Sequence, residues 1–76
     1  MKLYAGGYLT FYTPDQKPEL VCEISEPVEL VKLLGELGIP AGDVQLVILN
    51  GQIVELDQAI LRNQDEVKVF PGVDGG

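Results

Sequence analysis

The residues best suited to chemistry stand last in the sequence, at Gly75 and Gly76. A carboxylate is a poor electrophile, so the Gly76 carboxylate can exchange an oxygen only after activation, for which a mixed anhydride with AMP supplies a good leaving group. Because two glycines have no Cβ, such a segment can thread a narrow channel and bring its backbone close to a nucleotide and a metal. We therefore expect Gly76 to react, Gly75 to keep the path narrow, and the ATP site to lie on another protein.

Other reactive arrangements are excluded or weak. The chain has no histidine, which rules out Ser/His/Asp and Cys/His catalysis and any zinc site that uses imidazole. Its single cysteine, Cys22, cannot form an internal disulfide, and its place between Val21 and Ile24 indicates a core position. Glu55 and Asp57 alone offer too few oxygen ligands for a hard cation, so no metal site is predicted.

Length and sequence pattern also argue against an enzyme. A chain of 76 residues forms one small domain, in which a deep active site is not expected. The Gly6-Gly7 pair lacks the following helix and the spacing of a phosphate-binding loop. We therefore expect a chain that binds no cofactor itself and leaves the use of ATP to a partner enzyme.

The charge balance limits the classes of partner. Twelve acidic and five basic residues give a formal net charge of -7, and the basic residues are scattered singly, so nucleic acid is not an expected partner. The longest aliphatic run is residues 46–49, whereas a membrane-spanning helix needs about 20 residues. Residues 1–7 lack the apolar stretch of a secretory signal, so the expected location is the cytoplasm, away from any membrane.

The first third of the sequence predicts a hairpin. Apolar and polar side chains alternate over residues 2–5, which favours a strand, and the glycine pair that follows predicts a bend or a bulge. Residues 13–18 contain two prolines and an aspartate, the composition of a turn. Alternation resumes over residues 20–24, which predicts the second strand.

A helix is predicted next. It begins at the Ser-Glu-Pro step of residues 25–27, where a capping residue precedes a proline allowed in the first turn. Gly38 and Pro40 end it near Leu37. The apolar residues expected on its core face are Leu30, Val31, Leu34 and Leu37.

The second half of the chain predicts three more strands. Residues 44–49 are nearly all apolar, and the Asn50-Gly51 dipeptide that follows is a strong signal for a hairpin returning at residues 53–54. Residues 56–61 predict a short helical turn. The last strand is expected over residues 66–70, with Val67 and Val69 facing inward.

This order of elements predicts an α+β fold in which one mixed sheet packs on one helix. The first and last strands are expected side by side in the middle of the sheet. Residues 1–71 would form the domain. Residues 72–76 have no partner strand and are expected to project as a flexible Gly-Gly tail.

The predicted fold and the end of the chain together carry a family resemblance. The hairpin at residues 47–51, the Asp-Glu-Val start of the last strand at residues 65–67 and the ending Phe70-Pro71-Gly72-Val73-Asp74-Gly75-Gly76 are its sequence features. In these features the chain resembles the MoaD/ThiS family of ubiquitin-like sulfur carriers, which have the β-grasp fold. The resemblance covers essentially the whole chain, and its most specific part is the Gly-Gly ending after an aromatic-proline step.

The resemblance implies a protein substrate, not an enzyme. In that family an E1-like enzyme adenylates the terminal glycine carboxylate, which is then converted to a thiocarboxylate that donates sulfur during molybdopterin or thiamine synthesis. Carried over to this chain, it makes Gly76 the residue that carries sulfur. The implied partners are an E1-like adenylating enzyme, a sulfur donor such as a cysteine desulfurase, and the large subunit of a synthase.

The end of the sequence also bears on the branch of the family. The Phe70-Pro71 step favours molybdenum or tungsten cofactor synthesis, because thiamine-type carriers often lack it. Gly72 stands where molybdopterin-type carriers usually have a second proline, and Asp74 stands where they have a small residue. The Asp74 carboxylate is costly in the partner's channel unless it meets a cation, so either the partner has a matching arginine or lysine or activation is weak. The alternatives are a thiamine-type carrier, a ubiquitin-like modifier joined through Gly76 to lysines, and an interaction module that is never activated.

A docking surface is expected on the strand at residues 44–49. Because alternate residues point to opposite faces, either the pair Leu46 and Ile48 or the pair Val47 and Leu49 faces away from the helix. With Phe70 this pair forms an apolar patch for an adenylating enzyme or a synthase subunit, unless the tyrosines and residues 6–12 cover it. The residues expected to contact a partner are Leu46, Ile48, Phe70, Pro71, Gly72, Val73 and Asp74.

Acidic side chains are a further candidate for recognition. Asp65, Glu66 and Asp74 are expected near the tail, where they pair with a basic rim on the partner or remain solvated.

Overall fold

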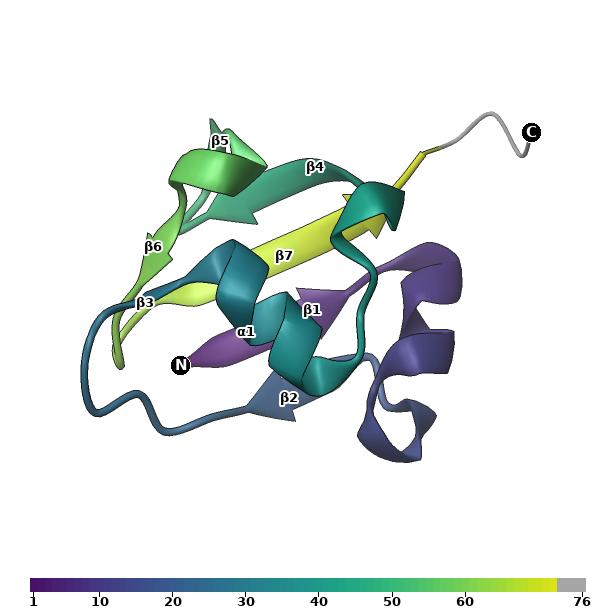
Figure 1. Ribbon diagram of the computed structural model, residues 1–76, viewed down its shortest axis with the longest axis horizontal. Helices are drawn as coiled ribbons and strands as arrows, with labels where there is room; N and C mark the ends of the chain where they lie inside the picture. The colour runs from purple at the N-terminus through teal and green to yellow at the C-terminus, as the bar shows by residue number, and fades with distance from the viewer. Residues whose placement is uncertain (73–76) are drawn as a thin grey trace.

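A five-stranded mixed sheet forms the centre of the structure, a computed structural model that describes residues 1–72 (Figure 1). The strands lie in the order β2-β1-β7-β4-β5, and only β1 and β7 pair in parallel. Their bounds are Lys2–Ala5 for β1, Glu19–Val21 for β2, Val44–Leu49 for β4, Gln52–Val54 for β5 and Glu66–Pro71 for β7. The predicted α+β class is confirmed, with the first and last strands side by side.

Helix α1 (Leu30–Leu37) crosses one face of this sheet and encloses the core (Figure 1). Alternate side chains of the two central strands point toward it, as the period of a strand requires. The buried residues of these strands are Leu3, Ala5, Val67 and Val69, and those of the helix are Leu30, Leu33 and Leu34. Burial of each leucine stabilises the fold by about 1.5–3 kcal/mol. The inward direction predicted for Val67 and Val69 is therefore confirmed.

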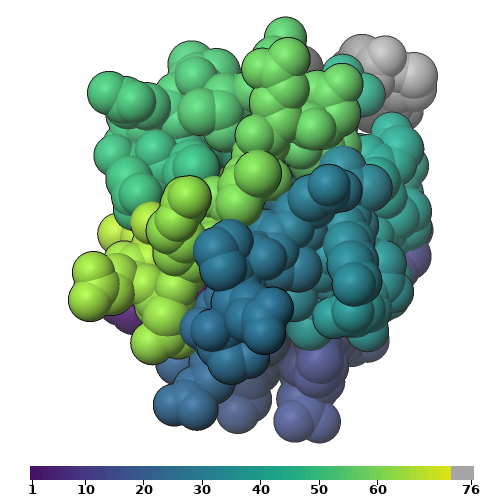
Figure 2. All heavy atoms as spheres, turned by 60° about the vertical axis from the view of Figure 1, so that its left-hand side comes forward, coloured from purple at the N-terminus to yellow at the C-terminus, as the bar shows by residue number. Residues whose placement is uncertain are grey.

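The predicted start of the helix is wrong. Residues Val28–Glu29 form a short strand, β3, which pairs with β6 (Ile60–Leu61), and α1 begins only at Leu30. The Leu30 N–H donates to the Ala59 carbonyl at 2.9 Å, so the first turn is anchored to a distant segment. Figure 2 shows the segment around β3 packed directly against the segment around β6. This pairing outweighs the local start signal at residues 25–27.

The core face of α1 also differs in part from the prediction. Val31 is 37% exposed, whereas Leu33, absent from the predicted set, is buried. The predicted helix end is confirmed, because Gly38 adopts the left-handed conformation at φ 85° and its N–H bonds to carbonyls of the last turn. The later start and the confirmed end leave a helix of eight residues.

The connection between β1 and β2 is longer and more structured than a turn. The two strands pair antiparallel as predicted, with Leu3 opposite Leu20. The second strand is shorter than predicted, because it ends at Val21 and not at Ile24. Between them lie two 3₁₀ segments, η1 (Gly7–Tyr12) and η2 (Pro14–Gln16). Leu9 on η1 is fully buried, so the segment is fixed against the core. After β2, the side chains of Cys22 and Ile24 are partly buried against the core.

The remaining connections are short. The Asn50-Gly51 turn is confirmed, since both residues have positive φ, at 51° and 85°, and β5 returns beside β4. Residues Ala41–Asp43 form a 3₁₀ turn, η3, and Leu56–Gln58 form another, η4. The helical turn predicted over residues 56–61 is therefore only half correct, because its second part is strand β6.

Candidate functional site

The face of the sheet opposite α1 carries an apolar surface. A β-bulge between Val44 and Leu46 shifts the register of β4, after which Val47 points into the core and Leu46 and Ile48 point outward. Leu49 packs at the edge of the core. Of the two sets expected to face away from the helix, the structure therefore selects Leu46 and Ile48.

Neighbouring strands extend this surface. Phe70 on β7 lies opposite Leu46, and Ile53 on β5 lies opposite Ile48. The ring of Tyr4 on β1 contacts the Phe70 ring at a centroid distance of 5.9 Å. We name Tyr4, Leu46, Ile48, Ile53 and Phe70 the outer-face patch.

The outer-face patch is open to solvent. Leu46 is 37% exposed and Ile53 is 74% exposed, although Tyr4 packs on one side of Phe70. The tyrosines and residues 6–12 therefore cover at most one corner of this face. An apolar surface that crosses four strands of so small a sheet suits a protein contact.

The end of β7 fits against a glycine pair. A Cβ at Gly6 would lie 2.4 Å from Cδ1 of Phe70, and a Cβ at Gly7 would lie 2.9 Å from Cγ of Pro71. The Gly6 N–H also donates to the Val69 carbonyl at 2.8 Å. Gly6 and Gly7, which we name the glycine seat, leave room for the Phe70 and Pro71 rings, so the chain leaves the sheet along a fixed path.

Sequence reasoning missed the glycine seat and placed the end of the strand one residue early. It treated the glycines as an interruption of β1, since only the pairing of β1 with β7 brings them to Phe70. β7 extends to Pro71, which lies opposite Val44. Gly72 follows beside Gln45, whose Cγ would be 3.1 Å from a Cβ at residue 72. The predicted site residues Val73, Asp74, Gly75 and Gly76 lie outside the described residues.

Comparison with known families adds the decisive observation. A model of the ThiS family matches residues 11–76, which extends from η1 through the last residue of the sequence. The chain belongs to the ThiS family. No curated protein matches it. ThiS-family members are small ubiquitin-like sulfur carriers, not enzymes, and they generally act with E1-like adenylating enzymes, so the predicted family and the β-grasp fold are confirmed.

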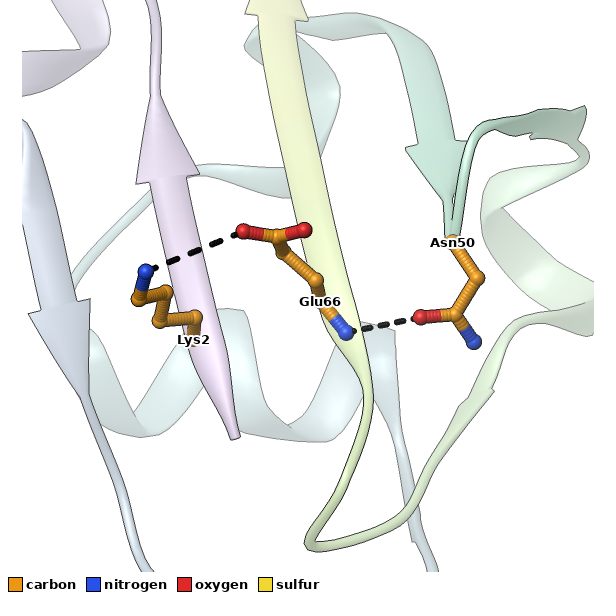
Figure 3. Close-up of polar contacts among 3 residues, drawn as sticks. All are labelled: Lys2, Asn50 and Glu66. Atoms are coloured by element: carbon orange, nitrogen blue, oxygen red, sulfur yellow. Dashed lines mark hydrogen bonds and ion pairs between the residues drawn. The ribbon is translucent and has the colours of Figure 1, made fainter.

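The start of β7 in this ThiS-family chain is held by polar contacts. Asn50 Nδ2 donates to Asp65 Oδ1 at 2.9 Å. Asn50 Oδ1 accepts from the Glu66 N–H at 2.9 Å, the bond drawn in Figure 3. The Arg62 N–H donates to the other Asp65 oxygen at 2.8 Å. The hydrogen bond from Asn50 and then that from Arg62 lower the pKa of Asp65 below its ordinary value, against a smaller opposing effect of burial.

The expectation that Asp65 and Glu66 lie near the tail is wrong. β7 runs from Glu66 to Pro71, so these carboxylates mark the end of the strand remote from the glycine seat. At about 3.3 Å per residue, Glu66 and Phe70 are about 13 Å apart along the strand. Asp65 is engaged with Asn50, and Glu66 Oε2 lies 3.9 Å from Lys2 Nζ (Figure 3). These two residues therefore do not form an acidic rim beside the tail.

Neither a metal site nor a membrane span is found in residues 1–72. No group of three or more His, Cys, Asp or Glu side chains in this range is placed to hold a metal ion. No helix in this range is long and apolar enough to cross a membrane. The described features of the candidate site are therefore the outer-face patch and the glycine seat.

Proposed function

We propose that this ThiS-family chain carries sulfur as a thiocarboxylate on Gly76 and donates it in molybdopterin synthesis, as part of molybdenum or tungsten cofactor production in the cytoplasm. The observation that carries the proposal is the family match, which runs through residue 76, together with the Phe70-Pro71 step on its glycine seat. The chain is a protein substrate. It binds no cofactor of its own, and ATP is bound by the partner enzyme.

Activation divides into two steps. The Gly76 carboxylate attacks the α-phosphate of ATP on an E1-like enzyme, which releases pyrophosphate and leaves an acyl-adenylate. A sulfur nucleophile then attacks the acyl carbon, AMP leaves, and the product is the thiocarboxylate. Where the donor is the persulfide of a cysteine desulfurase, a second thiol reduces the acyl disulfide that forms first.

The body of the protein contributes by positioning. The outer-face patch supplies apolar area for the adenylating enzyme and, in a later complex, for the large subunit of a synthase. The glycine seat fixes Phe70 and Pro71, so Gly72 begins from a defined point beside β4. Positioning of this kind converts a bimolecular encounter into a nearly unimolecular step.

Asp74 makes a specific demand on the partner. A carboxylate in a narrow channel is costly unless a cation pairs with it, so we propose that the cognate enzyme has an arginine or lysine at that depth. Asp74→Ala is then expected to slow adenylation by the cognate enzyme. A faster reaction of the variant would show that the channel has no such cation.

Intact-mass spectrometry tests the proposal directly. The chain is incubated with ATP, a sulfur donor and an E1-like enzyme, beside a chain that lacks Gly76. We expect the full chain alone to gain the mass difference of one oxygen replaced by one sulfur. The proposal fails when neither adenylate nor thiocarboxylate forms while the same enzyme activates a control carrier.

A second assay separates the family branches. The thiocarboxylate is supplied either to a molybdopterin synthase large subunit with its pterin precursor or to a thiazole synthase with its substrates. Product in the first reaction supports the proposed branch. Product only in the second assigns the chain to thiamine synthesis, an alternative favoured by Gly72 in place of a second proline. Isopeptide adducts in cell extract would instead identify a protein modifier.

A further inference from the structure

A cation stands inside the outer-face patch. Lys68 lies on β7, the central strand, and is aligned with Tyr4 on one side and with Ile48 on the other. Ile53 continues the same row on β5, and Phe70 lies two residues along β7 on the same face. Because Val67 and Val69 take the core positions, the Lys68 side chain is exposed on the outer face.

This cation has no carboxylate partner within the described residues. The one ion pair found among residues 1–72 joins Lys2 to Glu66, at 3.9 Å (Figure 3). Beside Lys68 the face is hollowed by a depression of about 410 Å³. Its lining includes two carboxylates, Glu19 and Glu66. Glu66 is paired with Lys2, and within the described residues no ion pair joins Lys68 to either carboxylate. Water therefore solvates the Lys68 ammonium in the free protein.

A partner that covers the outer-face patch removes that water. An ammonium buried against apolar groups without a counter-charge is strongly unfavourable. Strands are about 4.8 Å apart, so Lys68 lies about 10 Å from the outermost strand on either side, farther than its four-carbon stem extends. Glu66 of the chain itself is paired with Lys2, and Glu19 lies two strands away on β2. Docking on this patch is therefore most favourable when the partner supplies a negative charge near its centre.

We infer that the protein that docks on the outer-face patch presents an aspartate or glutamate to Lys68, and that Lys68 selects partners on this basis. The depression beside Lys68 has room for such a side chain, and Lys2 within it is already paired with Glu66, so Lys68 is the cation that such a side chain would meet. The inference rests on the proposed function, since it takes the E1-like enzyme as the docking protein. It runs against the net charge of -7, which by itself favours basic partners.

Binding measurements with matched variants test the inference. Isothermal titration with the purified cognate E1-like enzyme compares the unchanged chain with Lys68→Met, Lys68→Glu and Lys32→Glu. Lys32 is exposed on α1, the other layer of the fold, so Lys32→Glu changes the net charge as Lys68→Glu does but leaves the patch intact. All four proteins are expected to unfold at similar temperatures, because both lysines are exposed.

We expect Lys68→Met to raise Kd about tenfold or more, since it leaves the partner's carboxylate buried without a counter-charge. Lys68→Glu should weaken binding further, and Lys32→Glu should change it by about twofold at most. In the adenylation assay KM should rise with kcat unchanged, because Gly76 is untouched. Equal or tighter binding by Lys68→Met would overturn the inference, because it would mean that no carboxylate faces the lysine.

Two further outcomes separate this inference from the proposed function. Full activation of both the unchanged chain and Lys68→Met with equal KM rejects the role of Lys68 and leaves the sulfur carrier standing. Failure of the unchanged chain to bind or to be adenylated, while a control carrier is activated, rejects the proposed function and the inference with it. Rescue of Lys68→Glu by an Asp→Lys or Glu→Lys change in the enzyme would identify the opposing residue.

Discussion

The two ends of β7 are held by different physical means. At its start, Asn50 and Asp65 form directional hydrogen bonds around Glu66. At its end, the Phe70 and Pro71 rings lie where Gly6 and Gly7 have no side chains. The polar end fixes the register of the strand against the β4–β5 turn, whereas the apolar end fixes the path by which the chain leaves the sheet. Both are needed, because a register error would turn the patch inward and a path error would change where the chain leaves the sheet after Pro71.

The largest effect is expected from Gly6→Ala, which disrupts the packing of Phe70 at the end of β7. Its φ of -83° suits alanine, so the cost comes from the 2.4 Å approach to Phe70 and should be about 2–3 kcal/mol of unfolding free energy. Displacement of Phe70 should also slow adenylation by roughly tenfold or more. Urea unfolding and single-turnover adenylation measure the two effects.

A matched glycine provides the control for that experiment. A Cβ at Gly35, in the middle of α1, meets no atom within 4 Å, so Gly35→Ala should stabilise the protein by about 0.5–1 kcal/mol. In the double variant Gly6→Ala with Phe70→Ala, the penalty for the added methyl group should largely vanish. A Gly6→Ala protein as stable as the parent would show that the Phe70 ring moves aside freely.

A smaller effect is expected from Asn50→Gly, which breaks the polar end. Glycine adopts the φ of 51° without strain, so the change removes only the bonds to Asp65 and Glu66 and should cost about 1–2 kcal/mol of unfolding free energy. Adenylation of the folded variant should stay near the parent rate, since the glycine seat is intact. A fall in the adenylation rate equal to that of Gly6→Ala would mean that the hydrogen bonds at the start of β7 also control the position of its end.

Acid titration tests how much the Asp65 carboxylate stabilises the start of β7. Because the folded-state pKa of Asp65 is lowered, its stabilisation is present above the ordinary value of 3.8 and is lost as the pH falls through the lower folded value. Asp65→Asn should therefore lose less stability than the parent between about pH 5 and about pH 3. Unfolding free energies across this range test the prediction. Parallel curves of unfolding free energy against pH for parent and variant would contradict it. Asp57→Asn, at an exposed position on η4, is the control that removes the same charge elsewhere.

The smallest effect is expected from Lys2→Met. The Lys2–Glu66 pair is long at 3.9 Å, and both side chains are more than half exposed, so the variant should change the unfolding free energy by less than about 0.5 kcal/mol. Thermal unfolding in low and high salt measures this. A loss of stability comparable to that of Asn50→Gly would mean that the Lys2–Glu66 ion pair stabilises the start of β7 as much as the Asn50 hydrogen bonds do.

Features set by neighbouring residues could be predicted from the sequence. The Asn50-Gly51 turn and the helix end at Gly38 depend on backbone conformations that these residue types favour locally. The inward direction of Val67 and Val69 follows from strand alternation. Such signals act within a few residues, and they predicted the five strands of the main sheet and the order of these elements along the chain.

Features set by distant pairing could not be predicted. The helix starts late because β3 pairs with β6, a segment about thirty residues further along the chain. The glycine seat depends on β1 lying beside β7, and the isolation of Lys68 depends on neighbours from two other strands. The resemblance led to the proposal that Gly76 reacts, but it says nothing of which local contacts hold the last strand.

The parallel pairing of β1 with β7 has a consequence for synthesis. Lys2 pairs with Glu66, so the centre of the sheet joins residues from the two extremes of the described chain. A nascent or truncated chain that stops before residue 66 lacks its central strand and cannot complete its core, and such non-local pairing forms late in folding. A folded domain therefore requires that synthesis has passed through β7, and incomplete chains do not present an intact outer-face patch to the partner proposed for it.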